Sequence, residues 1–214
     1  MAIVCLLMAL LSGCTARSGQ FLYAMGFGKA PKIEAEFTLT DQPILIFVDD
    51  VHERFDWPQA EQHIFEELSQ ALLRNKAAHK IIPIETLSHV RQSMETFEKR
   101  GCREIGEQSG ATQVLWLEVR EFLADEQFSD ASNAAFITVS VKVIDVTEKE
   151  SRTRVRLWPP SPEGRVISAN LSGAEVAEAK SKDEVSKKLA EELGDSVSKL
   201  FYEHRADDMR KKKM

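Results

Sequence analysis

Two aspartates and a histidine follow the most apolar internal stretch of the chain, and they are its best candidates for chemistry. Pro43–Val48 reads PILIFV, which is typical of a central strand covered on both faces. Asp49, Asp50 and His52 come directly after it. Ligands of open α/β sheets bind beyond the carboxyl ends of strands. Two carboxylates and an imidazole there predict a divalent-metal or acid–base site. The alternative is a solvated turn in which the aspartates bond to nearby backbone amides.

The sequence lacks the spaced motifs that would indicate other chemistry. Its remaining histidines have neither H-E-x-x-H nor C-x-x-C spacing, and there is no P-loop and no G-x-S-x-G string. Gly26-Phe27-Gly28 is too short for a dinucleotide fingerprint. Cys102 falls near the apolar face of an expected helix, which favours a buried thiol over a nucleophile. We therefore expect no cofactor and identify no small-molecule substrate.

One aromatic residue is a candidate for contact with a partner. Trp158 begins the segment WPPSPEG, which ends at Gly164 and predicts a stiff hairpin tip. An exposed tryptophan beside prolines is suited to anchoring a protein partner. The alternative is a simple turn with Trp158 packed on the sheet.

The N-terminus carries the most specific pattern in the chain. Met1–Leu11 is apolar throughout, and Ser12, Gly13 and Cys14 follow. The run is too short to span a bilayer but suits a secretory signal, and Leu11–Cys14 resembles the lipobox of bacterial lipoproteins. The resemblance implies removal of residues 1–13 and attachment of diacylglycerol and a further acyl chain, such as palmitate, to Cys14. Several acyl chains give stable anchoring. The alternative is a buried hydrophobic N-terminal helix in which Cys14 is an ordinary residue.

The lipobox sets the expected organisation of the chain. Residues 1–13 are the signal peptide, residues 14–40 a lipidated tether, residues 41–205 an α/β domain and residues 206–214 a charged tail. In bacterial lipoproteins the residue after the cysteine influences sorting between membranes. Thr15 is not the aspartate associated with inner-membrane retention, so the resemblance implies the outer membrane, on its periplasmic side.

Hydrophobic periodicity predicts one domain that mixes parallel and antiparallel strands. The expected order is β-α-β-α-β-β-β-(β)-α, with helices packed on a mixed five- to six-stranded α/β sheet. Alternating apolar residues make Ala134–Val146 the clearest strand. The other expected strands are Pro43–Val48, His79–Ile84, Gln113–Phe122, Arg154–Trp158 and Arg165–Leu171. The expected helices run from Pro58 to Asn75, from an N-cap at Ser88 to Gly110, and from Lys182 to Arg205.

Composition excludes several classes of protein. The chain has 214 residues, of which 43% are apolar, and a formal charge of −6. This apolar content argues against bulk disorder, and the negative charge argues against nucleic-acid binding, which rests on neutralising phosphates. Three cysteines cannot form a multi-bridge framework.

The element order behind a lipobox resembles a known group of envelope proteins. The residues that carry the likeness are ILIFVDD in the first strand and Gly110-Ala111 leading into VLWLEV. They resemble the α/β domain of the curli secretion lipoprotein CsgG, the amino-terminal domain of TolB and related envelope lipoproteins. A membrane strand needs about 9–11 alternating residues, and only Ala134–Val146 approaches that length, so a pore subunit is not expected.

These patterns favour a membrane-anchored, non-enzymatic module of the cell envelope that binds other envelope proteins or assembles with itself. Such a module would serve secretion or envelope maintenance. The alternative is a small periplasmic hydrolase or metal-binding protein that uses Asp49, Asp50 and His52. A third possibility is a soluble cytoplasmic domain whose N-terminus is misread as a signal.

Overall fold

The computed structural model describes residues 31–50, 59–123, 135–149 and 155–206. The chain divides into two compact units. In the smaller unit, strand β1 (Lys32–Ile33) pairs antiparallel with β7 (His204–Arg205), and Lys32 forms an ion pair with Glu203 at 2.6 Å. The larger unit, Ala35–Tyr202, contains every other helix and strand described below. Among the described residues, no helix has the length and apolar character needed to cross a membrane.

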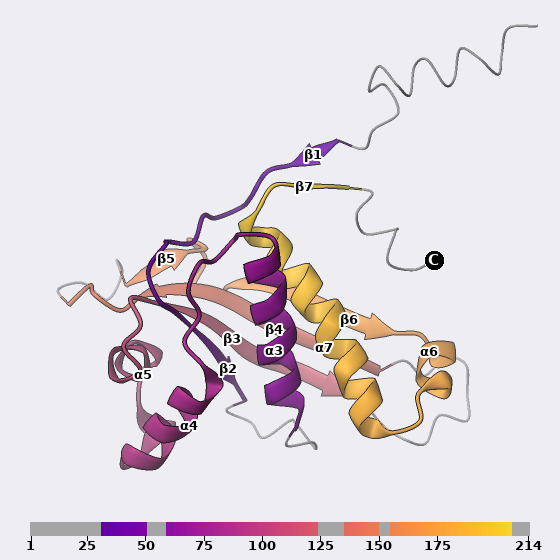
Figure 1. The fold of residues 1–214 in the computed structure, drawn as a ribbon, viewed down its shortest axis with the longest axis horizontal. Coiled ribbons are helices and arrows are strands. Elements are labelled where there is room, and N and C mark those ends of the chain that lie inside the picture. The colour runs from indigo at the N-terminus through magenta and orange to yellow at the C-terminus, as the bar shows by residue number, and fades with distance from the viewer. Residues whose placement is uncertain (1–30, 51–58, 124–134, 150–154, 207–214) are drawn as a thin grey trace, which may run out of the picture. The chain divides into compact units, whose positions relative to one another are not determined.

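The larger unit is built on a mixed five-stranded sheet (Figure 1). Its strands run in the order β2-β3-β4-β5, and β6 also pairs with β4. The first pair, β2 and β3, is parallel, whereas the pairs made by β4 are antiparallel. This confirms the predicted mixed α/β fold. The strands are β2 (Ile44–Asp49), β3 (Gln113–Leu123), β4 (Ala135–Asp145), β5 (Arg156–Trp158) and β6 (Arg165–Leu171).

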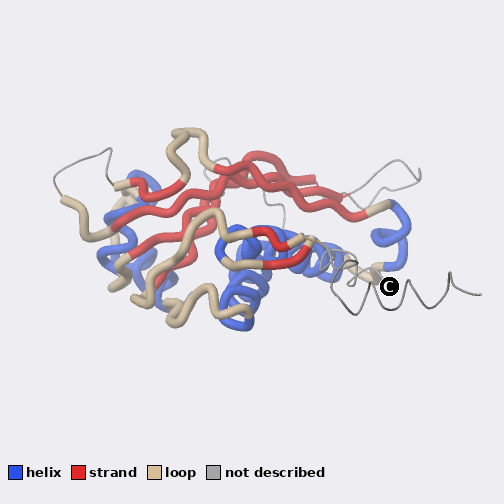
Figure 2. Tube along the Cα trace, turned by 90° about the horizontal axis from the view of Figure 1, so that it is seen from above, coloured by secondary structure: helices blue, strands red, loops and turns tan. Residues whose placement is uncertain are grey.

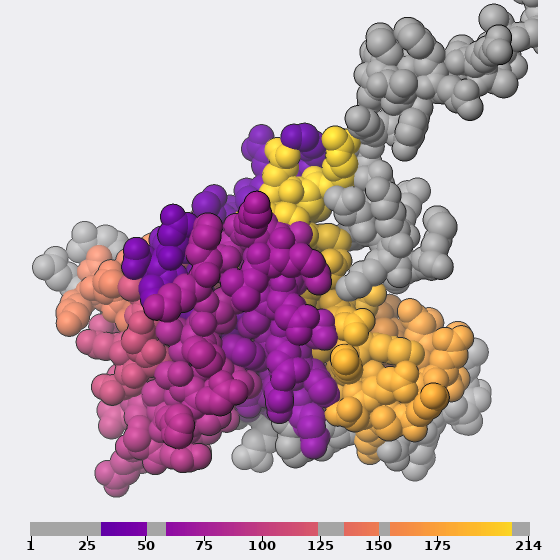
Figure 3. All heavy atoms as spheres, viewed as in Figure 1, coloured from indigo at the N-terminus to yellow at the C-terminus, as the bar shows by residue number. Residues whose placement is uncertain are grey.

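Two amphipathic helices cover one face of the sheet. Figure 2 shows α3 (Gln59–Arg74) and α7 (Lys182–Ser198) together on the same side of the strands, and their surfaces adjoin in Figure 3. Residues three and four apart bury one stripe of each helix. Gly194 lets the helices approach closely, because a Cβ at this position would lie 3.0 Å from the backbone of Glu67 and Leu68. The main apolar core lies between these helices and the sheet.

Shorter helices cover part of the opposite face. These are α4 (Ile84–Ser93), the 3₁₀ turn η1 (Phe97–Lys99) and α5 (Cys102–Gln108). They lie between β2 and β3 in the chain and form a second, smaller core. Gly110 has a φ of +73° just after α5, a conformation that glycine adopts without strain. The buried residues of the second core are Leu45, Phe47, Ile82, Leu87, Ile105, Ala111, Val114, Ile144 and Val146.

Two predictions for this region are wrong. The expected strand His79–Ile84 is reduced to a single bridge between Ile81 and Ile44, because Pro83 has no amide hydrogen to donate and α4 begins immediately after it. Ser88 is not an N-cap. It lies inside α4 and donates its hydroxyl to the carbonyl of Ile84 at 3.2 Å.

The expected continuous helix up to Gly110 is likewise wrong, because the chain leaves helical geometry at two places. Met94 is extended after α4, and Thr96 takes a φ of +62° before η1. Gly101 is then extended and precedes α5. The one predicted helix is therefore two helices and a 3₁₀ turn. These three elements surround a hollow and do not form a single straight helix along the sheet.

The last helix ends earlier than predicted. It stops at Ser198 and continues only as the 3₁₀ turn η2 (Lys199–Phe201). Leu200 and Phe201 are buried there, so the chain turns inward before Arg205. The structure also contains a short helix that was not predicted, α6 (Gly173–Glu178). It begins at a capping box formed by Ser172 and Glu175.

The folded unit begins before residue 41, inside the stretch predicted as tether. The backbone amides of Glu36 and Phe37 both donate to the carbonyl of Leu200, at 2.8 and 3.2 Å. Leu39 is buried, and Phe37 packs against the main core. The residues from Ala35 onward are therefore part of the compact unit.

Candidate functional site

The carboxyl end of β2 opens into a cavity of about 470 Å³. Asp49 is the last residue of the strand and Asp50 follows it, and both line this cavity. Its other walls come from α3, α4, η1 and the start of α5. Charged residues in the lining are Asp49, Asp50, Glu61, Glu98, Arg91 and Arg100, and apolar residues include Phe47, Val48, Phe97, Ile105 and Trp116. We call this cavity the Asp49 pocket.

The parallel register of β2 and β3 places the polar side chains. Phe47 pairs with Trp116, and Asp49 pairs with Glu118. Since side chains alternate between the faces of a strand, these four lie on the face opposite α3 and α7. Trp116 donates its indole N–H to Asp49 Oδ2 at 3.0 Å. The hydrogen bond fixes the orientation of the carboxylate at the edge of the pocket.

The surroundings of Asp49 oppose its ionisation. Partial burial raises the pKa of the Asp49 carboxyl above its usual range, and the nearby charges of Glu118 and Asp50 raise it further. The hydrogen bond from Trp116 and the charge of Lys142 act in the other direction. Burial is the largest of these effects, so the pKa is raised overall.

A buried lysine next to Asp49 is already engaged by other groups. Lys142 Nζ lies 2.9 Å from Glu118 Oε2 and 4.4 Å from the centre of the Trp116 ring. Arg120 adds a second contact to the same Glu118 oxygen at 3.2 Å. These contacts hold the lysine and its acidic partner together beside the pocket.

The opposite wall of the pocket is held by an arginine between an acid and an aromatic ring. Arg91 contacts Glu61 at 3.0 Å and lies 5.2 Å from the centre of the Phe97 ring. Phe97 in turn packs edge-on against Phe47, with ring centres 6.2 Å apart. The contacts join α3, α4 and η1 to β2, so the wall is part of the fold.

Cys102 lies in the same pocket but is poorly suited to nucleophilic attack. Burial, followed by the charge of Asp49, raises the pKa of the Cys102 thiol well above its usual range. Because the thiolate is the reactive form, the thiol stays protonated at neutral pH. This agrees with the expectation that Cys102 is a packed residue.

The structure brings together only some of the residues singled out from the sequence. Asp49 and Asp50 meet at the pocket, while His52 and Cys14 lie outside the described residues. Within the described ranges, no three histidine, cysteine, aspartate or glutamate side chains gather as metal ligands. Trp158 is buried between Phe37 and Phe201, with ring centres 6.3 and 5.7 Å away. Its ring is therefore part of the core and is not displayed to a partner.

Several residues in or beside the pocket were not singled out in the sequence analysis. Trp116 and Glu118 alternate with buried Leu115 and Leu117 along β3, and this pattern could have placed them on one face with Asp49. Lys142 interrupts an apolar run in β4, a departure that marks a paired buried charge. No local signal would have placed Arg91 or Phe97 there, since their positions depend on the break between α4 and α5.

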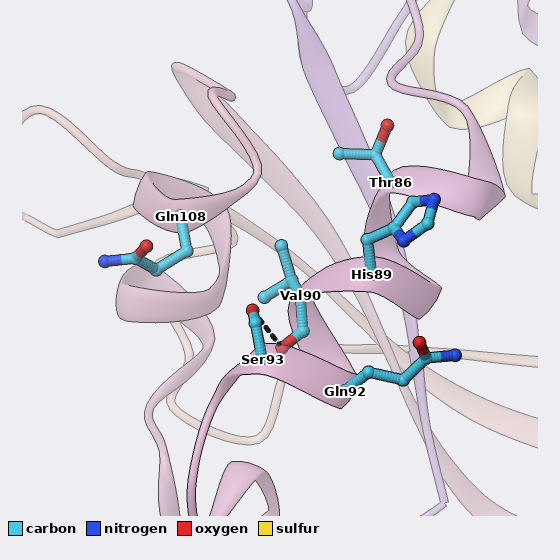
Figure 4. Close-up of a pocket in the computed structure, with 6 residues that line it drawn as sticks. All are labelled: Thr86, His89, Val90, Gln92, Ser93 and Gln108. Carbon is cyan, nitrogen blue, oxygen red and sulfur yellow. Dashed lines mark hydrogen bonds between the residues drawn. The ribbon is translucent and has the colours of Figure 1, made fainter.

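A second hollow, of about 550 Å³, lies between α4 and α5 (Figure 4). Its described lining consists of Thr86, His89, Val90, Gln92, Ser93 and Gln108, with no aspartate, glutamate, lysine or arginine among them. Ser93 donates to the carbonyl of Val90 at 3.1 Å, so its hydroxyl is already engaged. Figure 4 shows the side chains of Gln92 and Gln108 pointing away from each other. The hollow therefore lacks a convergent set of polar groups, and the Asp49 pocket is the better candidate.

No family model matches the chain, and no curated protein matches it. Solved structures do match. The PelC dodecamer from Paraburkholderia phytofirmans is 14% identical over 81% of this chain and 96% of that chain, with a TM-score of 0.40. Lipoprotein GNA1162 from Neisseria meningitidis is 14% identical over 61% and 83%, with a TM-score of 0.42. The C-terminal domain of LpoB from Salmonella enterica is 16% identical over 64% and 87%, with a TM-score of 0.39.

These three TM-scores lie below 0.5, and all three identities lie below 20%. Neither CsgG nor TolB is among these three structures, so the resemblance to that group stays a prediction. The function proposed next rests on the sequence and structure of this chain itself.

Proposed function

We propose that the chain is a lipoprotein of the bacterial cell envelope, anchored through Cys14, whose folded unit acts by binding other proteins. The observation that carries the proposal is the string Leu11–Cys14 at the end of an apolar run. Acyl chains on Cys14 would hold the domain at a membrane surface and raise its effective concentration there. Thr15 after the cysteine supports the outer membrane as the site of anchoring.

The character of the Asp49 pocket supports binding over turnover. The described lining holds no histidine, serine or lysine. A general base in this pocket would therefore have to be a carboxylate. Both arginines of the lining face acids, since Arg91 contacts Glu61 and Arg100 contacts Glu104 at 2.9 Å. The thiol of Cys102 stays protonated. A concave surface of charged groups and aromatic rings is suited to recognition.

The anchor is tested by changing Cys14 to alanine. We expect the wild-type protein to incorporate radiolabelled palmitate and to sediment with membranes. The Cys14→Ala variant should lose the label and leave the membrane pellet almost completely. Cys5→Ala is the matched control, because Cys5 lies inside the predicted signal peptide and should affect neither result. Retention of Cys14→Ala in the pellet would contradict the anchor.

The binding part is tested by crosslinking whole envelopes that contain a C-terminally tagged protein. Covalent partners should be recovered with the wild type and should decrease with Cys14→Ala, because the released domain is diluted. Density-gradient separation of inner and outer membranes in the same cells tests the assignment of the membrane.

A further inference from the structure

We propose that the Asp49 pocket binds a basic side chain, a lysine or arginine presented by a partner protein, with its charged end at Asp49 and its aliphatic stem along the aromatic wall. The inference deepens the proposed function and rests on the view that this chain binds proteins. The binding group is a basic side chain, so the pocket can be probed without knowing the identity of the partner protein.

The charge of the pocket lining favours a cationic occupant. Among the described residues of the lining, four are carboxylates and two are arginines, so the formal charges of these six sum to −2. Arg91 is matched by Glu61 within the lining, whereas Arg100 is matched by Glu104 outside it. Lys142, whose charge acts on Asp49, is matched by Glu118. Neither Asp49 nor Glu98 forms an ion pair with a described lysine or arginine, and their negative charge favours a cation over an anion.

The partly buried carboxylate of Asp49 gains more from a cationic occupant than from a neutral one. Its carboxylate has lost part of its hydration and receives one hydrogen bond from Trp116. A neutral apolar occupant would remove more water from it without compensation, which is costly. An ammonium or guanidinium group would replace that water with a charge-assisted hydrogen bond. A cationic occupant thus stabilises the ionised form, and a neutral one does not.

The size and shape of the pocket suit a basic side chain. Its volume of about 470 Å³ lies in the usual range of small-ligand sites. Phe47 and Phe97 stack edge to face at its apolar side, and Ile105 extends that surface. Lysine and arginine bury their aliphatic stems along such surfaces while the charged end stays near polar groups. The lining therefore fits both parts of a basic side chain.

The test uses the full-length protein purified in detergent and three blocked amino acids as probes. These are the N-acetyl, N-methylamide derivatives of lysine, norleucine and glutamate. We expect the lysine derivative to bind with a dissociation constant on the order of 1 mM, measured by ligand-observed NMR. The norleucine derivative, which lacks the charge, should bind about tenfold more weakly or not detectably, and the glutamate derivative should not bind.

Two variants locate the site. Asp49→Asn should weaken binding of the lysine derivative about tenfold, and a single cooperative unfolding transition would show that the variant is folded. Glu66→Gln is the matched control, since Glu66 is an exposed acid on α3 that bonds to Gln62 and does not line the pocket. Its binding should equal that of the wild type.

Equal binding of the lysine and norleucine derivatives would overturn the proposal, as would unchanged binding by Asp49→Asn. Either result would leave the anchor intact if Cys14→Ala is still released from membranes. Conversely, binding of the lysine derivative together with membrane retention of Cys14→Ala would contradict the lipoprotein function and leave the pocket inference standing. The two failures are therefore distinguishable.

Discussion

Asp49 has an acidic side chain placed where the fold disfavours its charge. It ends a strand whose other residues are buried, and the parallel neighbour brings Glu118 alongside. One hydrogen bond from Trp116 at 3.0 Å offsets part of that cost. Residues with such environments occur at binding sites more often than elsewhere, because a ligand can supply the interaction that the fold leaves out.

The raised pKa of Asp49 has a consequence for stability. The folded protein holds this proton more tightly than the unfolded chain does, so the contribution of Asp49 is most favourable at low pH. That contribution declines as the pH rises through the folded-state pKa. Asp49→Asn removes the titration while keeping an oxygen that can accept from Trp116. We expect the variant to gain stability relative to wild type as the pH rises from 3 to 7.

The gain should be less than about 1 kcal/mol, because Asp49 is only partly buried and solvent screens its charge. Urea unfolding of both proteins at several pH values measures it. Glu95→Gln, in the exposed turn after α4, is the matched control for loss of one carboxylate. A stability difference between Asp49→Asn and wild type that does not change with pH would contradict the raised pKa.

At the scale of elements, the close packing of α3 against α7 holds the main core. Gly194 permits this packing, because a Cβ at this position would lie only 3.0 Å from the backbone of Glu67 and Leu68. Replacing glycine by alanine in a helix usually stabilises it by up to about 1 kcal/mol. Here the added methyl group forces the helices apart, which costs about 1–3 kcal/mol.

We therefore expect Gly194→Ala to lower the free energy of unfolding by roughly 1–2 kcal/mol, measured by urea denaturation. Lys187→Ala, an exposed change on the same helix, should leave the stability almost unchanged. A Gly194→Ala protein more stable than wild type would show that helix propensity outweighs the close approach.

The elements predicted from the sequence differ in how well they match the structure, for physical reasons. β2 follows from a continuous run of buried apolar residues, and α3 follows from buried apolar residues at a period of 3.6; the local sequence contains both patterns directly. The failure at Ser88 has another cause, because Pro83 supplied the helix start five residues earlier. The break around Thr96 depends on the second core, in which Phe97 and Cys102 pack against a cluster that includes Phe47. A local window of sequence does not contain these contacts.

The residues of the candidate site likewise differ in how far they can be predicted from the local sequence. Asp49 and Asp50 were found from their place after a strand, because strand ends are recognisable in sequence. Trp116 and Lys142 required the register between three strands, and Arg91 required the tertiary position of α4. A pocket whose walls come from several separate elements is therefore only partly visible from one sequence.

At the scale of the whole molecule, the larger compact unit begins at Ala35. Glu36 and Phe37 add to the last turn of the unit by bonding to Leu200. Phe37 and Phe201 enclose Trp158, and Leu39 is 5% exposed. The predicted tether up to residue 40 thus includes a segment that seals the core at its end.

This arrangement predicts how the chain tolerates shortening from its N-terminus. A protein of residues 35–202 should unfold cooperatively in urea, because it keeps the whole compact unit. A protein of residues 41–202 should be less stable by roughly 3–5 kcal/mol, the usual cost of removing large buried side chains. Trp158 should also be more exposed in it, which its fluorescence reports. Equal denaturation midpoints for the two proteins would place Phe37 and Leu39 outside the cooperative fold and return residues 35–40 to the tether.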